Sequence, residues 1–129
     1  MSLIRYPEYL RFDVSPTAIE LCKKKFKHDP SKTFKHIAEY NEDKADLALS
    51  LDVVYHLVEY QVYQTHLSNV FRSSDKWALI FSNDHNENDG VSEHVKHRKF
   101  TKDVKKFHPN WKLIKTWDNP HPFKGNYES

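Results

Sequence analysis

The sequence predicts a doubly wound α/β fold built on a partial parallel sheet. Two observations lead to this prediction. Apolar runs typical of strands alternate with segments of helical periodicity, and the longest runs are apolar at nearly every position, as in strands covered on both faces. The 129 residues suffice for one core, and 38% of them are hydrophobic. We therefore treat residues 1–129 as a single domain.

The first predicted unit is a short strand over residues 9–14 followed by a helix. Ser15 is a good N-cap, and Pro16 suits the first helical position, where its missing N–H is not needed. The pair Asp29-Pro30 ends this helix. Its apolar face, in which Cys22 is expected to be buried, recurs at helical spacing: Ala18, Ile19, Cys22 and Phe26.

Two further strands and a second helix are predicted in the middle of the chain. Residues 34–39 form a weak strand candidate, whereas residues 46–54 form a nearly continuous apolar run and the strongest one. The helix covers residues 59–72. Its buried stripe is expected to hold Tyr63, His66 or Leu67, Val70 and Phe71.

The last third predicts a buried strand over residues 76–82, a polar loop over 83–93 and a helix over 99–108. A final strand over 111–117 is expected at an edge of the sheet, because it contains two lysines. Sequence from Pro120 onward is irregular. The three tryptophans, Trp77, Trp111 and Trp117, are interpreted as core residues.

Polar residues follow the predicted strands at their carboxyl ends. Right-handed crossovers place these ends along one edge of a doubly wound sheet, where such folds bind ligands. The sequence therefore predicts a site there, formed from Asp13, Asp52, Tyr55, His56, Asn83, Asp84, His85 and Asp118.

Three segments in this order resemble motifs of class I S-adenosylmethionine-dependent methyltransferases, which have a Rossmann-like sheet. Residues 12–20, Phe-Asp-Val-Ser-Pro-Thr-Ala-Ile-Glu, resemble the motif in which an acid closes the second strand. Residues 46–57 look like the fourth strand and its following turn, and residues 77–82 are similar to the fifth strand. The resemblance covers about residues 9–120 and implies strands two to six of the family fold, with flanking helices.

The resemblance also implies a methyltransferase activity and roles for individual residues. Asp13 would bind the ribose hydroxyls of S-adenosylmethionine, and Val14 would pack near its adenine. Leu51 and Asp52 would flank the methionine moiety. Tyr55 and His56 would face the methyl acceptor, whose identity the sequence does not reveal, with His56 as the candidate general base.

A purely structural role remains an alternative for each of these residues. For Asp13 the alternative to the favoured ribose-binding role is to cap the helix together with Ser15, and for Asp52 and His56 the alternative is an ordinary strand-end or helix-cap role. His97 and Arg98 lie in a basic run that would suit a phosphate-bearing substrate or form a solvated face. Cys22 has no local base to activate it. The spacing of the loop histidines matches no standard metal site.

The chain departs from the family pattern before residue 9. The family's first strand and Gly-rich loop should precede that point, yet residues 1–8 supply neither, and the only glycines are Gly90 and Gly125. We interpret the domain as incomplete at its N-terminus and at its C-terminus. It is then a truncated product, a half that binds a partner chain, or a descendant in which strands 9–14 and 46–54 pair directly. Exposed strand edges would favour a homodimer or a partner chain.

Two functions follow as hypotheses: a methyltransferase-like domain, inactive if nothing completes it, or a non-catalytic dimeric interaction module. A net charge of +2 gives no reason to expect nucleic acid as a partner. No run approaches the ~18 apolar residues of a membrane span, and no signal-peptide pattern is present. The expected location is therefore the cytoplasm, with which a single cysteine is compatible.

Overall fold

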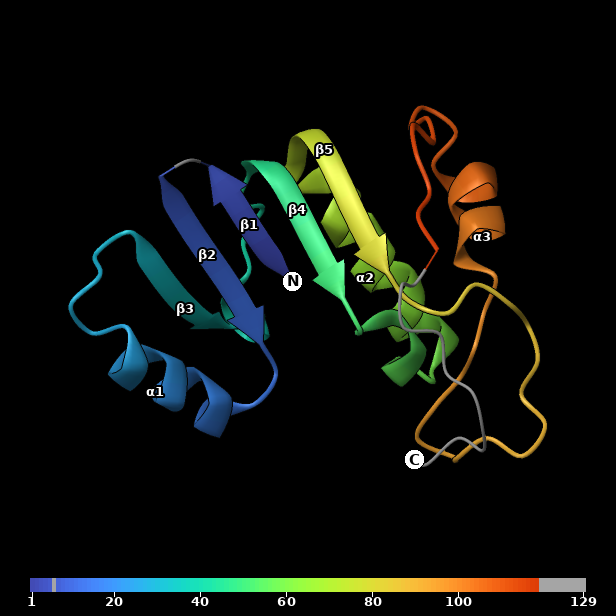
Figure 1. Cartoon of the computed structure of the whole chain (residues 1–129), viewed down its shortest axis with the longest axis horizontal. Coiled ribbons are helices and arrows are strands. Elements are labelled where there is room, and N and C mark those ends of the chain that lie inside the picture. Colours follow the sequence, from blue (N-terminus) through green and yellow to red (C-terminus); the bar gives the residue numbers. More distant parts are fainter. Residues whose placement is uncertain (6, 119–129) are drawn as a thin grey trace.

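The computed structural model describes residues 1–5 and 7–118, which fold into a five-stranded sheet with three α-helices (Figure 1). The predicted α/β class is thus confirmed. No helix among these residues is both long and apolar enough to cross a membrane. In chain order the elements are β1 (Ser2–Arg5), β2 (Glu8–Asp13), α1 (Pro16–Lys25), β3 (Lys32–His36), the 3-10 turn η1 (Ile37–Glu39), β4 (Ala45–Leu51), the 3-10 turn η2 (Val54–His56), α2 (Tyr60–Arg72), β5 (Ser74–Phe81) and α3 (Phe100–Phe107).

The sheet is mixed, with the strand order β3-β2-β1-β4-β5. β2 runs parallel to β3 and β4 runs parallel to β5, whereas β1 is antiparallel to both of its neighbours. Because β1 opposes both β2 and β4, the other four strands all point the same way. Their carboxyl ends therefore meet at one edge of the sheet, as the sequence predicted.

Strand β1 was not predicted. It lies between β2 and β4, so the direct pairing of strands 9–14 and 46–54 that we considered is wrong. A hairpin with Pro7 in its turn joins β1 to β2. Leu3 pairs with Leu10 on one side and Ala48 on the other, and is 2% exposed. A four-residue strand is too short to show a recognisable alternation in sequence.

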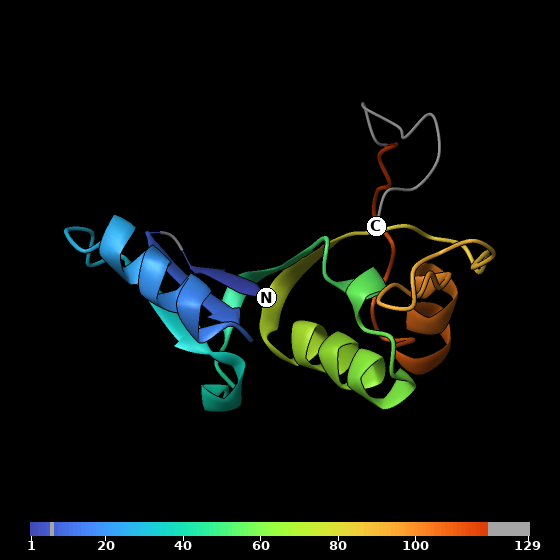
Figure 2. The same ribbon diagram turned by 90° about the horizontal axis from the view of Figure 1, so that it is seen from below.

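Helices α1 and α2 cover opposite faces of different halves of the sheet (Figure 2). On β3, Phe34 stacks on Phe26 at the end of α1, with ring centroids 5.7 Å apart. On β2, Phe12 pairs in register with Lys35. Lys35 follows Phe34 in the strand, and successive side chains point to opposite faces, so Phe12 points away from α1. There it joins the core cluster that contains Val70 of α2.

Local signals predicted where the helices begin, although α1 ends at Lys25 and not at Asp29-Pro30 as expected. The Ser15 hydroxyl accepts a hydrogen bond from the Ala18 N–H at 3.2 Å, and Pro16 is the first helical residue. The stripe of α2 is buried as predicted, with Leu67 rather than His66 as its fully buried member: Tyr63, Leu67, Val70 and Phe71. Cys22 is only half-buried, because it lies beside the Arg11 side chain rather than within a core.

The described residues cover strands β4 and β5 on one face only, whereas the sequence predicted burial on both. Ala48 and Ser50 face α2 and are fully buried. Their neighbours form three cross-strand pairs on the other side, which α1 leaves open because it lies over β2 and β3. The prediction that Trp77 is a core residue is therefore wrong, since it is 58% exposed. We call this surface the β4–β5 apolar face: Leu47, Leu49, Leu51, Trp77, Leu79 and Phe81.

Residues 111–117 form no strand, contrary to prediction. Trp111 packs against Phe71 of α2, with centroids 4.9 Å apart, but the following residues leave the body of the molecule. Leu113, Ile114 and Trp117 are 72%, 75% and 66% exposed, so Trp117 is not a core residue either. We call residues 111–117 the apolar tail segment. The pattern misled because a strand needs a neighbour, and β5 pairs only with β4 among the described residues. Predictions from Pro120 onward fall outside the described residues.

Candidate functional site at the carboxyl edge of the sheet

Most of the predicted site residues lie in two groups on either side of β1, but Asp118 does not belong to either, because residues 111–117 form no strand that would end there. Asp13 ends β2 and is followed by Val14, whereas Leu51 ends β4 and is followed by Asp52. The two strand ends are separated by β1 and so lie two strand spacings apart, roughly 10 Å. The paths of the chain diverge here, since α1 follows β2 on one face and α2 follows β4 on the other. Such a divergence marks the ligand crevice of open α/β sheets.

Asp13 is held by local contacts, and its side chain is 22% exposed. One carboxylate oxygen accepts from the Ser15 N–H at 2.9 Å, and the other accepts from the Arg11 guanidinium at 3.3 Å. The helix-capping interpretation of Asp13 is thus visible in the structure. A carboxylate has about four acceptor positions, so these two bonds leave capacity for a ligand hydroxyl.

Val14 and His36 form the surface next to Asp13. The Val14 side chain is 72% exposed, and its carbonyl accepts from the His36 imidazole at 3.0 Å. The other ring nitrogen of His36 accepts from the Ala38 N–H, which fixes the tautomer with the proton on Nε2. His36 therefore ties the end of β3 to the end of β2. Sequence analysis did not single it out, because nothing local distinguishes it from a solvated histidine.

Asp52 has a left-handed backbone conformation, with φ of 56°. Its N–H donates to the Phe81 carbonyl at 2.9 Å, which closes the end of the β4–β5 ladder. Aspartate tolerates this conformation better than most residues. The turn leaves Asp52 exposed, beyond the end of the ladder.

Tyr55 and His56 follow on η2. Their rings lie 4.3 Å apart, and His56 is exposed whereas Tyr55 is half-buried. Burial and the Asp52 carboxylate both raise the pKa of the Tyr55 hydroxyl, so it is a neutral donor at physiological pH. These contacts bring Asp52, Tyr55 and His56 together on the β4 side of the edge.

The loop after β5 folds back onto this group. The Lys96 N–H donates to the Tyr55 carbonyl at 2.8 Å, and the His97 ring lies 6.2 Å from the Tyr55 ring. His97 is 2% exposed, and the side chain of Asn88 holds both its N–H and its carbonyl. Burial, and then the nearby His85, lower the pKa of His97 and keep it neutral. His97 thus packs behind Tyr55 instead of projecting into solvent.

Arg98 is also buried, which the basic run around it did not indicate. Its guanidinium donates to the Leu57 and Val58 carbonyls, both at 2.5 Å, and lies 4.4 Å from the centre of the Tyr63 ring. Tyr63 in turn donates to Asp103 of α3 at 2.7 Å. Arg98 therefore connects the segment after His56 to α2 and α3.

A buried hydroxyl–imidazole pair lies beneath the site. The Ser50 hydroxyl and the His66 Nε2 atom are 2.7 Å apart, and Ser50 is fully buried between β4 and α2. Burial lowers the pKa of His66 to about 4. Ser50 has no access to a substrate, so the pair is structural. The sequence had offered His66 only as an alternative member of the α2 stripe.

Two cavities are present in the described structure, and neither lies between the two groups. The larger, of about 300 Å³, opens at the opposite edge of the sheet, where Arg5, Glu8, Lys35 and Lys44 line it. The smaller lies between Asp13 and α1 and has no room for a water molecule. Among residues 1–5 and 7–118 no cluster of three metal-binding side chains exists.

Comparison with known proteins adds no assignment: no family model, no curated protein and no solved structure matches this chain.

Proposed function

We propose that the chain carries an S-adenosylmethionine-dependent methyltransferase-type site at the carboxyl edge of its sheet. The observation that supports this most is the divergence of the crossovers between β2 and β4, each of which is closed by an aspartate. Asp13 would accept hydrogen bonds from the ribose, beside Val14 for the adenine. Leu51 and Asp52 would flank the methionine moiety.

The described residues fit this cofactor in part. An accessible carboxylate beside an exposed aliphatic side chain suits a nucleoside. The central strand β1 runs the opposite way, however, and no glycine precedes Asp13 to allow a close approach of the backbone. Residues 1–12 do not supply the loop that would hold the rest of the cofactor. We therefore derive no reaction step through it.

On the acceptor side, the proposal rests on Tyr55 and His56. Methyl transfer depends mostly on positioning, so it does not require a strong base. His56 is exposed and would accept a proton from an acceptor hydroxyl or amine. His97 and Arg98 are buried, so we propose that they support the Tyr55 segment in contacting the acceptor.

Calorimetric titration of the full chain with S-adenosylmethionine and S-adenosylhomocysteine tests the proposal. The variant Asp13→Asn can still accept from the Ser15 N–H but loses the charge, and should weaken binding roughly 10- to 100-fold. The matched control is Asp75→Asn, which removes an exposed ion pair with Arg5 at the other edge of the sheet. A folded chain that gives no saturable heat with either ligand would refute the proposal.

The second candidate function is a non-catalytic module that acts by association. The antiparallel β1 and the uncovered β4–β5 apolar face favour it. Under this alternative, titration shows no cofactor binding, while the chain still self-associates.

A further inference from the structure

The β4–β5 apolar face is an unusually large open surface for a sheet of parallel strands. Strands of this kind are normally covered on both faces. Its three cross-strand pairs form two aligned rows, and Trp77, Leu79, Phe81 and Leu51 are between 38% and 58% exposed. From the area of such side chains, on the order of 400 Å² of apolar surface is open, which is within the range of functional patches.

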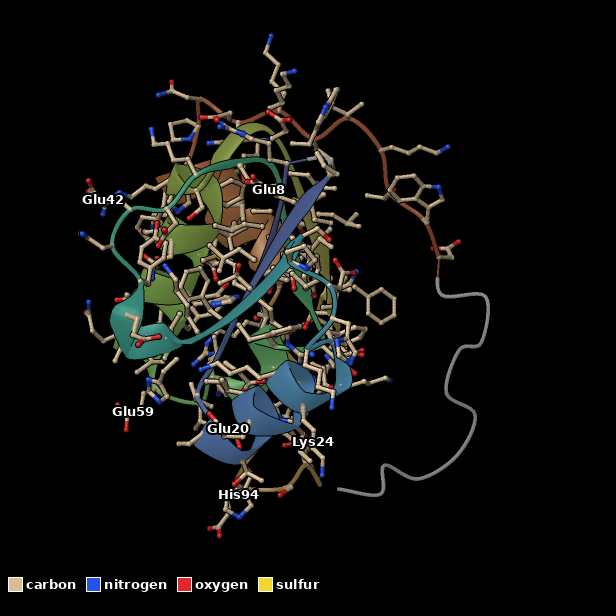
Figure 3. All side chains as sticks on the ribbon, turned by 90° about the vertical axis from the view of Figure 1, so that its left-hand side faces the viewer. Glu8, Glu20, Lys24, Glu42, Glu59 and His94 are labelled. Atoms are coloured by element: carbon tan, nitrogen blue, oxygen red, sulfur yellow. The ribbon has the colours of Figure 1, made fainter. Side chains whose placement is uncertain are left out.

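The apolar tail segment is a second open surface, on the same side of the sheet. Its ribbon leaves the body of the molecule on the side where α1 lies (Figures 2 and 3). In an extended chain Leu113 and Trp117 point to the same side, four residues apart. Leu47 and Leu51 on β4, and Trp77 and Phe81 on β5, have this same spacing of roughly 13 Å.

The tail segment does not cover the face of its own chain in this structure. Trp111 is fixed on Phe71 of α2. Beyond this anchor Leu113, Ile114 and Trp117 are 72%, 75% and 66% exposed, and Trp77 on the face is 58% exposed, so the two surfaces do not bury one another.

We propose that the β4–β5 apolar face binds the apolar tail segment of a second copy of this chain, in a reciprocal two-fold exchange. In this dimer Leu113 and Trp117 of one protomer pack between the rows of its partner. A two-fold axis repeats the contact, so both faces and both segments are covered at once. Leu113 and Trp117 add on the order of 300 Å² to the roughly 400 Å² of the face, so each protomer would bury on the order of 700 Å², close to the roughly 800 Å² per partner of a standard stable interface.

Light scattering during gel filtration of the full chain tests the exchange. The wild-type chain should be a dimer. Trp117→Asp on the tail segment and Leu79→Asp on the face should each raise the dissociation constant at least roughly 100-fold. Val62→Asp is the matched control, because Val62 is an exposed apolar residue on α2, away from both surfaces, and should leave the dimer intact. Circular dichroism checks that each variant is folded.

Two further measurements distinguish exchange from other dimers. A mixture of Trp117→Asp and Leu79→Asp chains retains one intact contact and should form a heterodimer in native mass spectrometry. In a Cys22→Ser background, Leu79→Cys and Trp117→Cys chains should form an intermolecular disulfide when mixed. A monomeric wild-type chain, or a dimer that Trp117→Asp leaves unchanged, would overturn the proposal. The test does not depend on cofactor binding.

Discussion

Replacement of Arg98 is the most direct test of how the candidate site is held together. Arg98 donates to two carbonyls in the segment after His56 and lies against the Tyr63 ring. Arg98→Met keeps the aliphatic stem but removes every donor. The Leu57 carbonyl then loses its partner in a half-buried position, at a cost of about 1–3 kcal/mol, whereas the more exposed Val58 carbonyl gains water instead. Loss of the cation–π contact adds about 1 kcal/mol, so the free energy of unfolding should fall by about 2–4 kcal/mol.

Equilibrium unfolding in urea, followed by tryptophan fluorescence, measures this change. With a slope of about 2 kcal/mol/M, in the middle of the usual range for urea, the midpoint should fall by roughly 1–2 M. Arg98→Lys keeps the charge but cannot reach both carbonyls, and should fall between wild type and Arg98→Met. Arg5→Met, which removes an exposed ion pair, should change the free energy by less than about 1 kcal/mol. A loss at Arg98→Met no larger than at Arg5→Met would refute the structural role.

Two further changes test the fold around the site. Burial lowers the pKa of His66 from 6.5 to about 4, so the unfolded chain binds a proton that the folded chain does not. Stability should therefore be complete above pH 6.5 and fall by about 3 kcal/mol as the pH drops toward 4. Burial also lowers the pKa values of His97 and His108, so these residues contribute a loss of stability in the same direction. The measurement is therefore the difference in unfolding free energy between wild type and His66→Gln across this pH window. Parallel curves of unfolding free energy against pH would contradict the prediction. Ser15→Ala should cost about 1 kcal/mol of unfolding free energy by removing the cap on α1, whereas Ser15→Thr should restore most of it. Equal urea midpoints for Ala and Thr would show that the cap contributes nothing.

The parts of the fold that local chemistry determines were predictable from the sequence. The capping hydroxyl of Ser15 and the 3.6-residue stripe of α2 operate within a few residues, so α1 and α2 appeared where expected. The alternation of elements also predicted one edge for all the carboxyl ends, which the parallel ladders provide. These signals require no knowledge of distant parts of the chain.

The predictions that were wrong concern structure that depends on neighbouring strands and helices, which a local sequence pattern cannot reveal. Residues 111–117 have the composition of a strand, but they form no backbone hydrogen-bond ladder with β5, which pairs only with β4 among the described residues. Strand β1 has too few residues for a pattern, and its place is fixed by Leu10 and Ala48 on the adjacent strands. Trp77 is of a residue type usually found in cores, yet it is 58% exposed, because none of the helices in the described part of the chain lies above it.

The site shows the same division between local and distant interactions. Asp13 and Asp52 were found because strand ends are recognisable in sequence. Arg98 was interpreted as part of a basic run, because its partners at residues 57 and 58 lie about forty positions away. A charged residue that is buried by such distant contacts is indistinguishable in sequence from a solvated one.

The two proposals meet at Leu51. This residue belongs to the β4–β5 apolar face and also precedes Asp52 at the carboxyl edge. A tail segment from a second copy that packs against Phe81 and Leu51 would also cover one side of the proposed cofactor site. Binding of the cofactor and association of two chains would then be linked, and each would change the other by the same factor. Asp13→Asn should weaken cofactor binding by removing a contact with the cofactor. Trp117→Asp should instead dissociate the dimer, and should weaken cofactor binding only as a consequence of that dissociation. A cofactor affinity that is equal in wild type and Trp117→Asp would show that the two surfaces act independently.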